Sequence, residues 1–152
     1  MIDREDGPLA EFTTSAWSSA GIATLHAVGE DKRSALEAGL RAVLALTVAP
    51  PDTPPDTGRS APIRGEGNDL GTLFADLVED LLEQIEFFGG GLYDVAVDGV
   101  LRREDGGYVG WGHAYGPLFG GPLAGAPRLL GTPMASEDAD AGVVLHASLQ
   151  RP

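Results

Sequence analysis

The chain has no cysteine among its 152 residues. This excludes disulfide bonds, thiolate metal ligands and a cysteine nucleophile, so the fold must rest on packing and hydrogen bonding. Positive charge is also scarce, because 10 Lys and Arg face 23 Asp and Glu, a formal net charge of −13. Contacts to phosphate groups need a basic surface that releases counterions. We therefore expect no direct binding to nucleic acid, and we expect proteins or cations as partners.

Long apolar runs are missing too. No stretch approaches the ~20 apolar residues of a membrane-spanning helix, and residues 1–6 lack the basic start and apolar run of a signal peptide. These absences predict a cytoplasmic protein with no membrane partner. The length and the 43% hydrophobic content suit one domain with a core. We predict a flexible N-terminus at residues 1–14 and a single domain at 15–152, with a proline-rich loop at 50–62.

Residues 69–87 predict an amphipathic helix with a wholly acidic outer face. Apolar residues recur every three or four positions, which places them on one buried side of a helix. The opposite side carries Asp76, Glu79, Asp80, Glu83 and Glu86. The sequence has no Lys or Arg between Arg64 and Arg102 that could pair with them. The face is therefore either a solubilising surface or a surface for a metal or partner, with Glu79 and Glu83 as candidate partner contacts.

The remaining pattern predicts one further helix and six strands. A helix at 31–47 has Asp31 as its N-cap and ends before a pair of prolines, and the acidic helix has Asn68 or Asp69 as its N-cap. We predict an α+β fold with both helices packed on one face of a mixed or antiparallel sheet of about six strands. The predicted strands are 22–28, 61–66, 93–101, 108–116, 128–134 and 142–149, with an acidic turn at 136–140.

Catalytic motifs are few. His26, His113 and His146 each fall in a predicted strand, and they could form a zinc site with an open fourth position if they pointed to one side. That arrangement would make the protein a small histidine-metal enzyme, whereas histidines in the core or at an edge are the simpler interpretation. The triple glycine at 89–91 follows a helix, so it reads as a C-cap and turn instead of a phosphate cradle. We predict no catalytic residues and no enzymatic activity.

Several stretches resemble the archease family, and the resemblance spans residues 18–149. In that family the second helix has a Leu-Leu-x-Asp-Trp-Leu-x-Glu-Leu-Leu pattern, which residues 73–82 resemble, with Asp76 at the Asp and Asp80 at the Glu. The other matching stretches are Gly29-Glu30-Asp31 with Ala35, Leu36 and Ala38, then Ala114-Tyr115-Gly116 followed by Phe119, and Gly131-Thr132.

The resemblance implies an α+β domain that binds a divalent, calcium-like cation. It also implies an accessory role in tRNA ligation and processing, in which the protein contacts an RNA-splicing ligase and promotes its guanylylation. Asp76 and Asp80 would then belong to the metal site.

The chain departs from the family at other positions of that site. Gly21 stands at the Asp of the family's His-Thr-Ala-Asp motif, Pro117 replaces a Glu, and Pro133-Met134 replaces a Tyr-His pair. Residues 150–152 end the chain where an Asp is expected. Calcium takes about six to eight oxygen ligands, so we expect cation binding to be weak or lost. The alternative is a diverged protein-interaction or small-ligand binding module with no role in RNA ligation.

Overall fold

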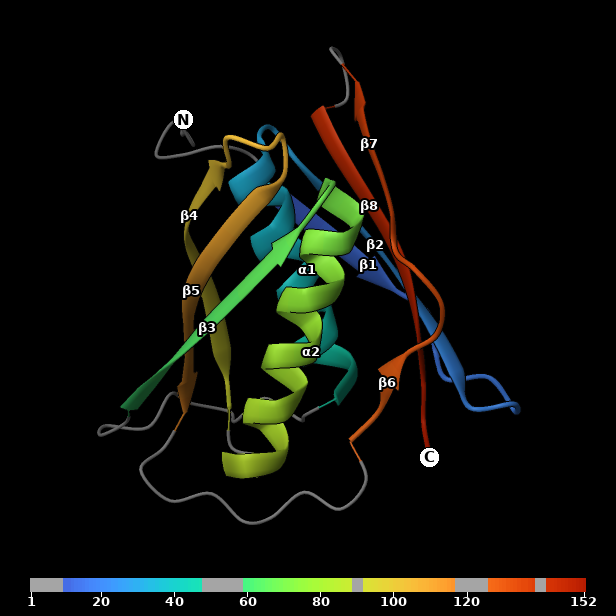
Figure 1. The fold of residues 1–152 in the computed structure, drawn as a ribbon. Helices are drawn as coiled ribbons and strands as arrows, with labels where there is room; N and C mark the ends of the chain where they lie inside the picture. The colour runs from blue at the N-terminus through green and yellow to red at the C-terminus, as the bar shows by residue number, and fades with distance from the viewer. Residues whose placement is uncertain (1–9, 48–58, 89–91, 117–125, 139–141) are drawn as a thin grey trace, which may run out of the picture.

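The computed structural model describes residues 10–47, 59–88, 92–116, 126–138 and 142–152, and Figure 1 shows their arrangement. These described residues form two helices and eight strands. The helices are α1 (Lys32–Thr47) and α2 (Leu70–Phe88). The strands are β1 (Ala10–Thr14), β2 (Ile22–Gly29), β3 (Arg59–Gly67), β4 (Asp94–Arg102), β5 (Tyr108–Gly116), β6 (Arg128–Leu129), β7 (Met134–Asp138) and β8 (Gly142–Gln150).

The α+β class is confirmed, and every pairing between the described strands is antiparallel. The strands form two sheets, however, where we predicted one sheet of about six strands. A five-stranded sheet has the order β1-β2-β8-β6, with β7 also paired to β8, and a three-stranded sheet has the order β3-β5-β4. The two helices lie between these sheets (Figure 1). Alternation along a strand shows which side chains share a face, but it does not show which strands pair.

Four predicted segments were wrong in their extent. Residues Ala10–Thr14 form β1, paired to β2 from Ala10↔Gly29 to Thr14↔Leu25, although we predicted a flexible segment through residue 14. Residues 59–62 of the predicted proline-rich loop belong to β3, while 48–58 lie outside the described residues. The predicted strand 128–134 is split because Gly131 has a φ of +77°, and β7 extends into the predicted acidic turn.

The predicted N-cap Asp31 is confirmed, and of the two candidates Asn68 and Asp69 the structure selects Asp69; both N-caps form reciprocal capping boxes. The Asp31 carboxylate accepts the Ser34 amide at 2.8 Å, and the Ser34 hydroxyl accepts the Asp31 amide at 3.2 Å. Asp69 and Thr72 repeat this pattern at 2.8 and 3.1 Å. The Thr72 amide and hydroxyl lower the pKa of Asp69. Burial acts to raise the pKa of Asp31, but hydrogen bonds from Ser34 outweigh it and the pKa is lowered.

One continuous core joins both helices to both sheets. The apolar side of α2 is its centre, with Leu73, Phe74, Leu77 and Leu81 fully buried. Gly39 of α1 allows the two helices to approach closely, because a Cβ at this position would lie 2.6 Å from the Phe74 ring of α2. The predicted amphipathic pattern of α2 is therefore confirmed, and its polar side is left facing outward.

Candidate functional site

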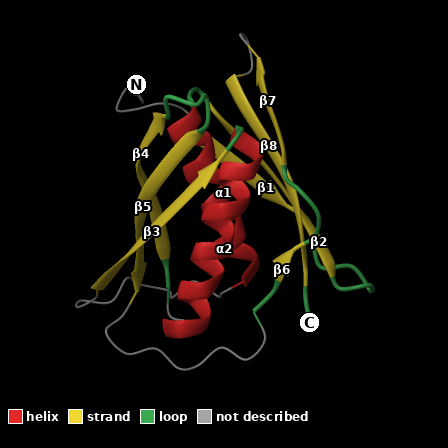
Figure 2. Cartoon of the chain, viewed as in Figure 1, coloured by secondary structure: helices red, strands yellow, loops and turns green. Residues whose placement is uncertain are grey.

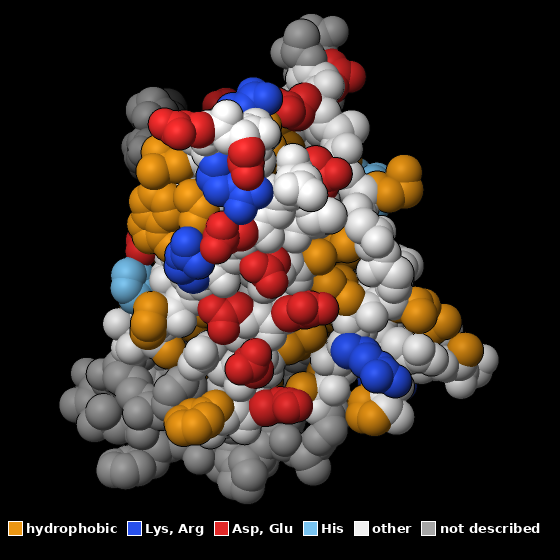
Figure 3. Space-filling model, in the orientation of Figure 1, with side chains coloured by type: hydrophobic (Ala, Val, Ile, Leu, Met, Phe, Trp, Pro, Cys, Tyr) orange, Lys and Arg blue, Asp and Glu red, His pale blue; other side chains and the backbone are white. Residues whose placement is uncertain are grey.

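The outer side of α2 presents the predicted acidic face. Asp76, Glu79, Glu83 and Glu86 are exposed, and Asp80 is half-buried. Figure 3 shows these acidic side chains gathered in one band over the helix. The structure therefore brings together all the residues that the sequence placed on this face, but it divides them into two groups with different surroundings.

The first group consists of Asp76 and Asp80, which are hydrogen-bonded to the outer edge of β3. The Oδ2 atom of Asp80 accepts the Arg64 amide, and that of Asp76 accepts the Glu66 amide, both at 2.8 Å. β3 is at the edge of its sheet, so alternate amides point away from β5. Pro62, two residues before Arg64, belongs to the same alternate set and has no amide hydrogen. The two carboxylates and the proline together leave few unpaired donors on an edge that could pair with another chain.

The second group, Glu79, Glu83 and Glu86, is not bonded to β3. Glu79, Glu83 and Glu86 make no hydrogen bond or ion pair within the described part of the chain. Of the basic side chains nearest along the sequence, Arg64 binds Glu66 at 3.0 Å, and Arg102 lies over the Tyr108 ring with its guanidinium carbon 5.6 Å from the ring centre. Arg103 also binds Glu66, at 2.8 Å. The hydrogen bond from Arg103, followed by that from Arg64, lowers the pKa of Glu66. The carboxylates of Glu79, Glu83 and Glu86 are therefore available to a partner.

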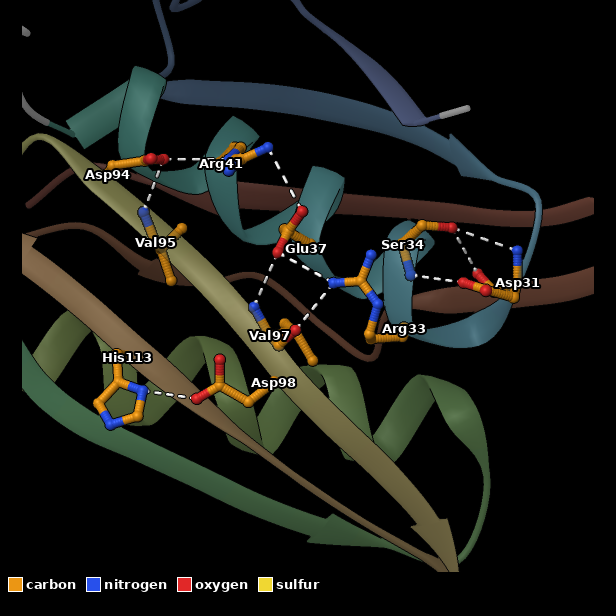
Figure 4. Close-up of polar contacts among 10 residues, drawn as sticks. All are labelled: Asp31, Arg33, Ser34, Glu37, Arg41, Asp94, Val95, Val97, Asp98 and His113. Atoms are coloured by element: carbon orange, nitrogen blue, oxygen red, sulfur yellow. Dashed lines mark hydrogen bonds and ion pairs between the residues drawn. The ribbon is translucent and has the colours of Figure 1, made fainter. Parts of the chain in front are cut away.

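The other edge of the three-stranded sheet is bonded to α1 by a network that the sequence analysis missed (Figure 4). Glu37 Oε1 accepts the Val97 amide at 3.0 Å, and Arg33 donates to the Val97 carbonyl at 2.8 Å. Arg33 and Arg41 both pair with Glu37, at 3.2 and 3.4 Å. The sequence signal was the i,i+4 series Arg33, Glu37, Arg41. This spacing predicts ion pairs along one helix, but it does not predict a bond from Glu37 to a strand. Each edge of this sheet is thus covered by helix carboxylates.

The described residues do not fit a calcium site of the kind that the resemblance implies. In the described ranges, no group of three or more His, Asp or Glu is placed to hold a metal ion. Gly21 does lie beside the C-terminal segment, because its carbonyl accepts the Arg151 amide at 2.8 Å. The Arg151 side chain lies over the Trp17 ring, with its guanidinium carbon 4.8 Å from the ring centre. Asp76 and Asp80 are bonded to the other sheet, and each uses one oxygen there.

The three histidines do not converge, so the three-histidine zinc site that the sequence left open does not form. His26 and His146 are directly opposite each other on β2 and β8, with ring centroids 4.4 Å apart. His113 belongs to β5 of the other sheet, where its Nδ1 lies 2.5 Å from an Asp98 carboxylate oxygen (Figure 4). The sequence placed all three in strands correctly, but only the strand pairing decides which of them meet.

Comparisons with known proteins show the fold and no more. No protein-family model matches the chain, and no curated protein matches it. The chain is similar in structure to protein 1598 of Methanobacterium thermoautotrophicum, known from a solution structure, with a TM-score of 0.55. The similarity covers 94% of this chain and 98% of that one, at 18% sequence identity. In the described residues, no helix is long and apolar enough to cross a membrane.

Proposed function

We propose that this chain is an archease-like accessory protein that assists an RNA-splicing ligase by direct protein contact. The proposal joins the motif resemblance of residues 18–149 to an α+β fold with the expected helices. It is supported by the formal charge of −13, which disfavours direct binding to RNA and favours a basic protein surface. An accessory protein of this kind acts in the cytoplasm, together with its ligase.

The observation that carries the proposal is the unpaired acidic group on α2. Glu79, Glu83 and Glu86 are exposed and make no bond within the described residues, so their charges repel one another along the helix. A basic partner would relieve this repulsion, and complementary charge raises both the rate and the specificity of association. Glu79 and Glu83 are the proposed contacts, while Asp76 and Asp80 are bonded to the edge of β3.

The proposed function does not depend on a tightly bound divalent cation. Any calcium bound by this chain is held weakly, because the described donors do not build the oxygen shell that calcium needs. A cation shared between Asp76 or Asp80 and a partner carboxylate is compatible with the geometry, since only Oδ2 of each is bonded to β3. The protein alone is expected to act through contact.

The test is a binding measurement with the purified RNA-splicing ligase of the same organism. Biolayer interferometry should show association that weakens with salt, since the Debye length falls from about 10 Å at 0.1 M to about 3 Å at 1 M. Glu79→Gln with Glu83→Gln should reduce the association rate. Glu30→Gln with Glu104→Gln removes equal charge from exposed positions outside α2 and serves as the matched control. Equal effects of the two pairs would contradict the proposed surface.

The alternative is a protein-interaction module with no role in RNA ligation, and the same face supports it. The two are separated by adding the protein to the ligase and measuring ligase guanylylation. Faster guanylylation supports the accessory role. Binding to other proteins through Glu79 and Glu83, with no binding to the ligase, supports the alternative.

A further inference from the structure

The outer face of the five-stranded sheet is a second surface with distinctive chemistry. Leu25 of β2 and Leu145 of β8 point into the core, so alternate residues, including His26 and His146, point to the opposite side. Both helices lie on the inner side of this sheet (Figure 2). No helix of the described chain covers the outer side.

The strand register aligns four side chains in a row across this face. Thr13 of β1 is opposite His26, His26 is opposite His146, and His146 is opposite Met134 of β7. Directly opposite residues of antiparallel strands have their Cβ atoms about 4.5–5.5 Å apart, so their side chains touch. The two imidazole rings are tilted by 53° with their centroids 4.4 Å apart. All four side chains line one groove of about 530 Å³.

The donor atoms in this groove are available to a ligand. Neither His26 nor His146 makes a hydrogen bond or ion pair with another described residue, and the two rings contact each other. Met134 is 72% exposed, which brings its thioether into the same solvent-facing row. Metal–nitrogen bonds of about 2 Å place two nitrogen ligands of one ion roughly 3–4 Å apart, a separation that these paired rings can reach.

We propose that His26, His146 and Met134 form a surface copper site that favours Cu(I). Imidazole binds copper, zinc and nickel, whereas a soft thioether selects Cu(I). Zinc takes thiolate, imidazole and carboxylate ligands, and calcium takes oxygen, so neither uses Met134. The site is distinct from the acidic face of α2 and does not depend on the proposed function. Because neither imidazole donates a hydrogen bond to a neighbouring group among the described residues, the affinity is modest compared with a buried site.

The test is an anaerobic competition of the full chain with bicinchoninate for Cu(I), which should give one site per chain. Loss of an outer-shell partner alone commonly costs about 10–100-fold in metal affinity, so His26→Gln and His146→Gln should each cost at least that much. Met134→Leu keeps the volume of the side chain and should weaken Cu(I) binding while leaving zinc binding unchanged. His113→Gln on the other sheet is the matched control and should have no effect.

Nuclear magnetic resonance locates the ion independently of affinity. The chain has two methionines, Met1 and Met134, so Cu(I) should shift the methyl signal of Met134 and leave that of Met1 in place. The imidazole signals of His26 and His146 should shift, and that of His113 should not. Undetectable Cu(I) binding would overturn the proposal. So would binding that survives both histidine substitutions in folded protein, or a Met134→Leu variant that binds Cu(I) as the wild type does.

Discussion

Asp76 and Asp80 provide the sharpest test of how the acidic helix is used. If they hold the edge of β3, the double substitution Asp76→Asn and Asp80→Asn should destabilise the protein, although it removes two of five like charges from one helix face. The matched pair Glu79→Gln and Glu83→Gln removes the same charge from the same helix, but neither side chain is bonded to β3. The two variants should therefore change the free energy of unfolding in opposite directions.

The expected changes in the free energy of unfolding follow from the hydrogen bonds that Asp76 and Asp80 accept. A hydrogen bond to a charged acceptor contributes about 1.5–3 kcal/mol and a neutral one about 0.5–1.5 kcal/mol, so each Asp→Asn change costs roughly 1 kcal/mol. Solvent exposure reduces this value, and relief of i,i+4 repulsion returns about 0.2–0.5 kcal/mol per pair. The net expectation is a loss of about 1 kcal/mol for the Asn pair. The Gln pair should gain a few tenths of a kcal/mol.

Urea unfolding followed by circular dichroism measures both differences, provided that the dependence on urea concentration is unchanged. For a chain of this size, about 1 kcal/mol corresponds to a fall of roughly 2–4 °C in Tm. Hydrogen exchange gives a local readout, since the amides of Arg64 and Glu66 should exchange faster in the Asn pair alone. An Asn pair that is as stable as the Gln pair would refute the edge-holding role and return Asp76 and Asp80 to the solvated surface.

Three further outcomes are expected. The folded pKa values of Asp31 and Asp69 lie below their ordinary value of 3.8. The stability that the two ionised carboxylates contribute is therefore complete well above pH 4. It is lost as the pH falls through the folded pKa values. Asp31→Asn with Asp69→Asn keeps the acceptor oxygens but removes both charges, so it should lower stability at pH 7 and flatten the decline in acid, measured by urea unfolding at each pH. Leu77→Asp places a charge at a fully buried position of α2. This costs several kcal/mol, whereas the total free energy of unfolding of a domain is roughly 5–15 kcal/mol. Circular dichroism should show an unfolded chain, and a variant with the wild-type Tm would contradict the packing of α2. Calcium should bind no more tightly than roughly 10⁻⁴–10⁻³ M, so micromolar binding in titration calorimetry would restore the full metal site implied by the archease resemblance.

The sequence by itself determined the features that depend on near neighbours along the chain. The position of α2, its apolar side and its acidic side all follow from the 3.6-residue period, and the structure confirms them. The N-cap Asp31 was predicted from the sequence, and the second N-cap was narrowed to Asn68 or Asp69; the bond from the Thr72 amide identifies Asp69. These features are local, because the residues that interact are separated by three or four positions and meet in any helix that forms.

Only the tertiary structure decided which distant residues meet. The division into two sheets, the addition of β1 to β2 and the separation of His113 from His26 and His146 all depend on strand pairing. So does the role of Asp76 and Asp80, whose spacing looks the same as that of Glu79 and Glu83 until β3 is placed beside them. Period-two alternation is the same whichever neighbour a strand has, so the choice of neighbour is set by the packing of the whole core and cannot be read from one segment.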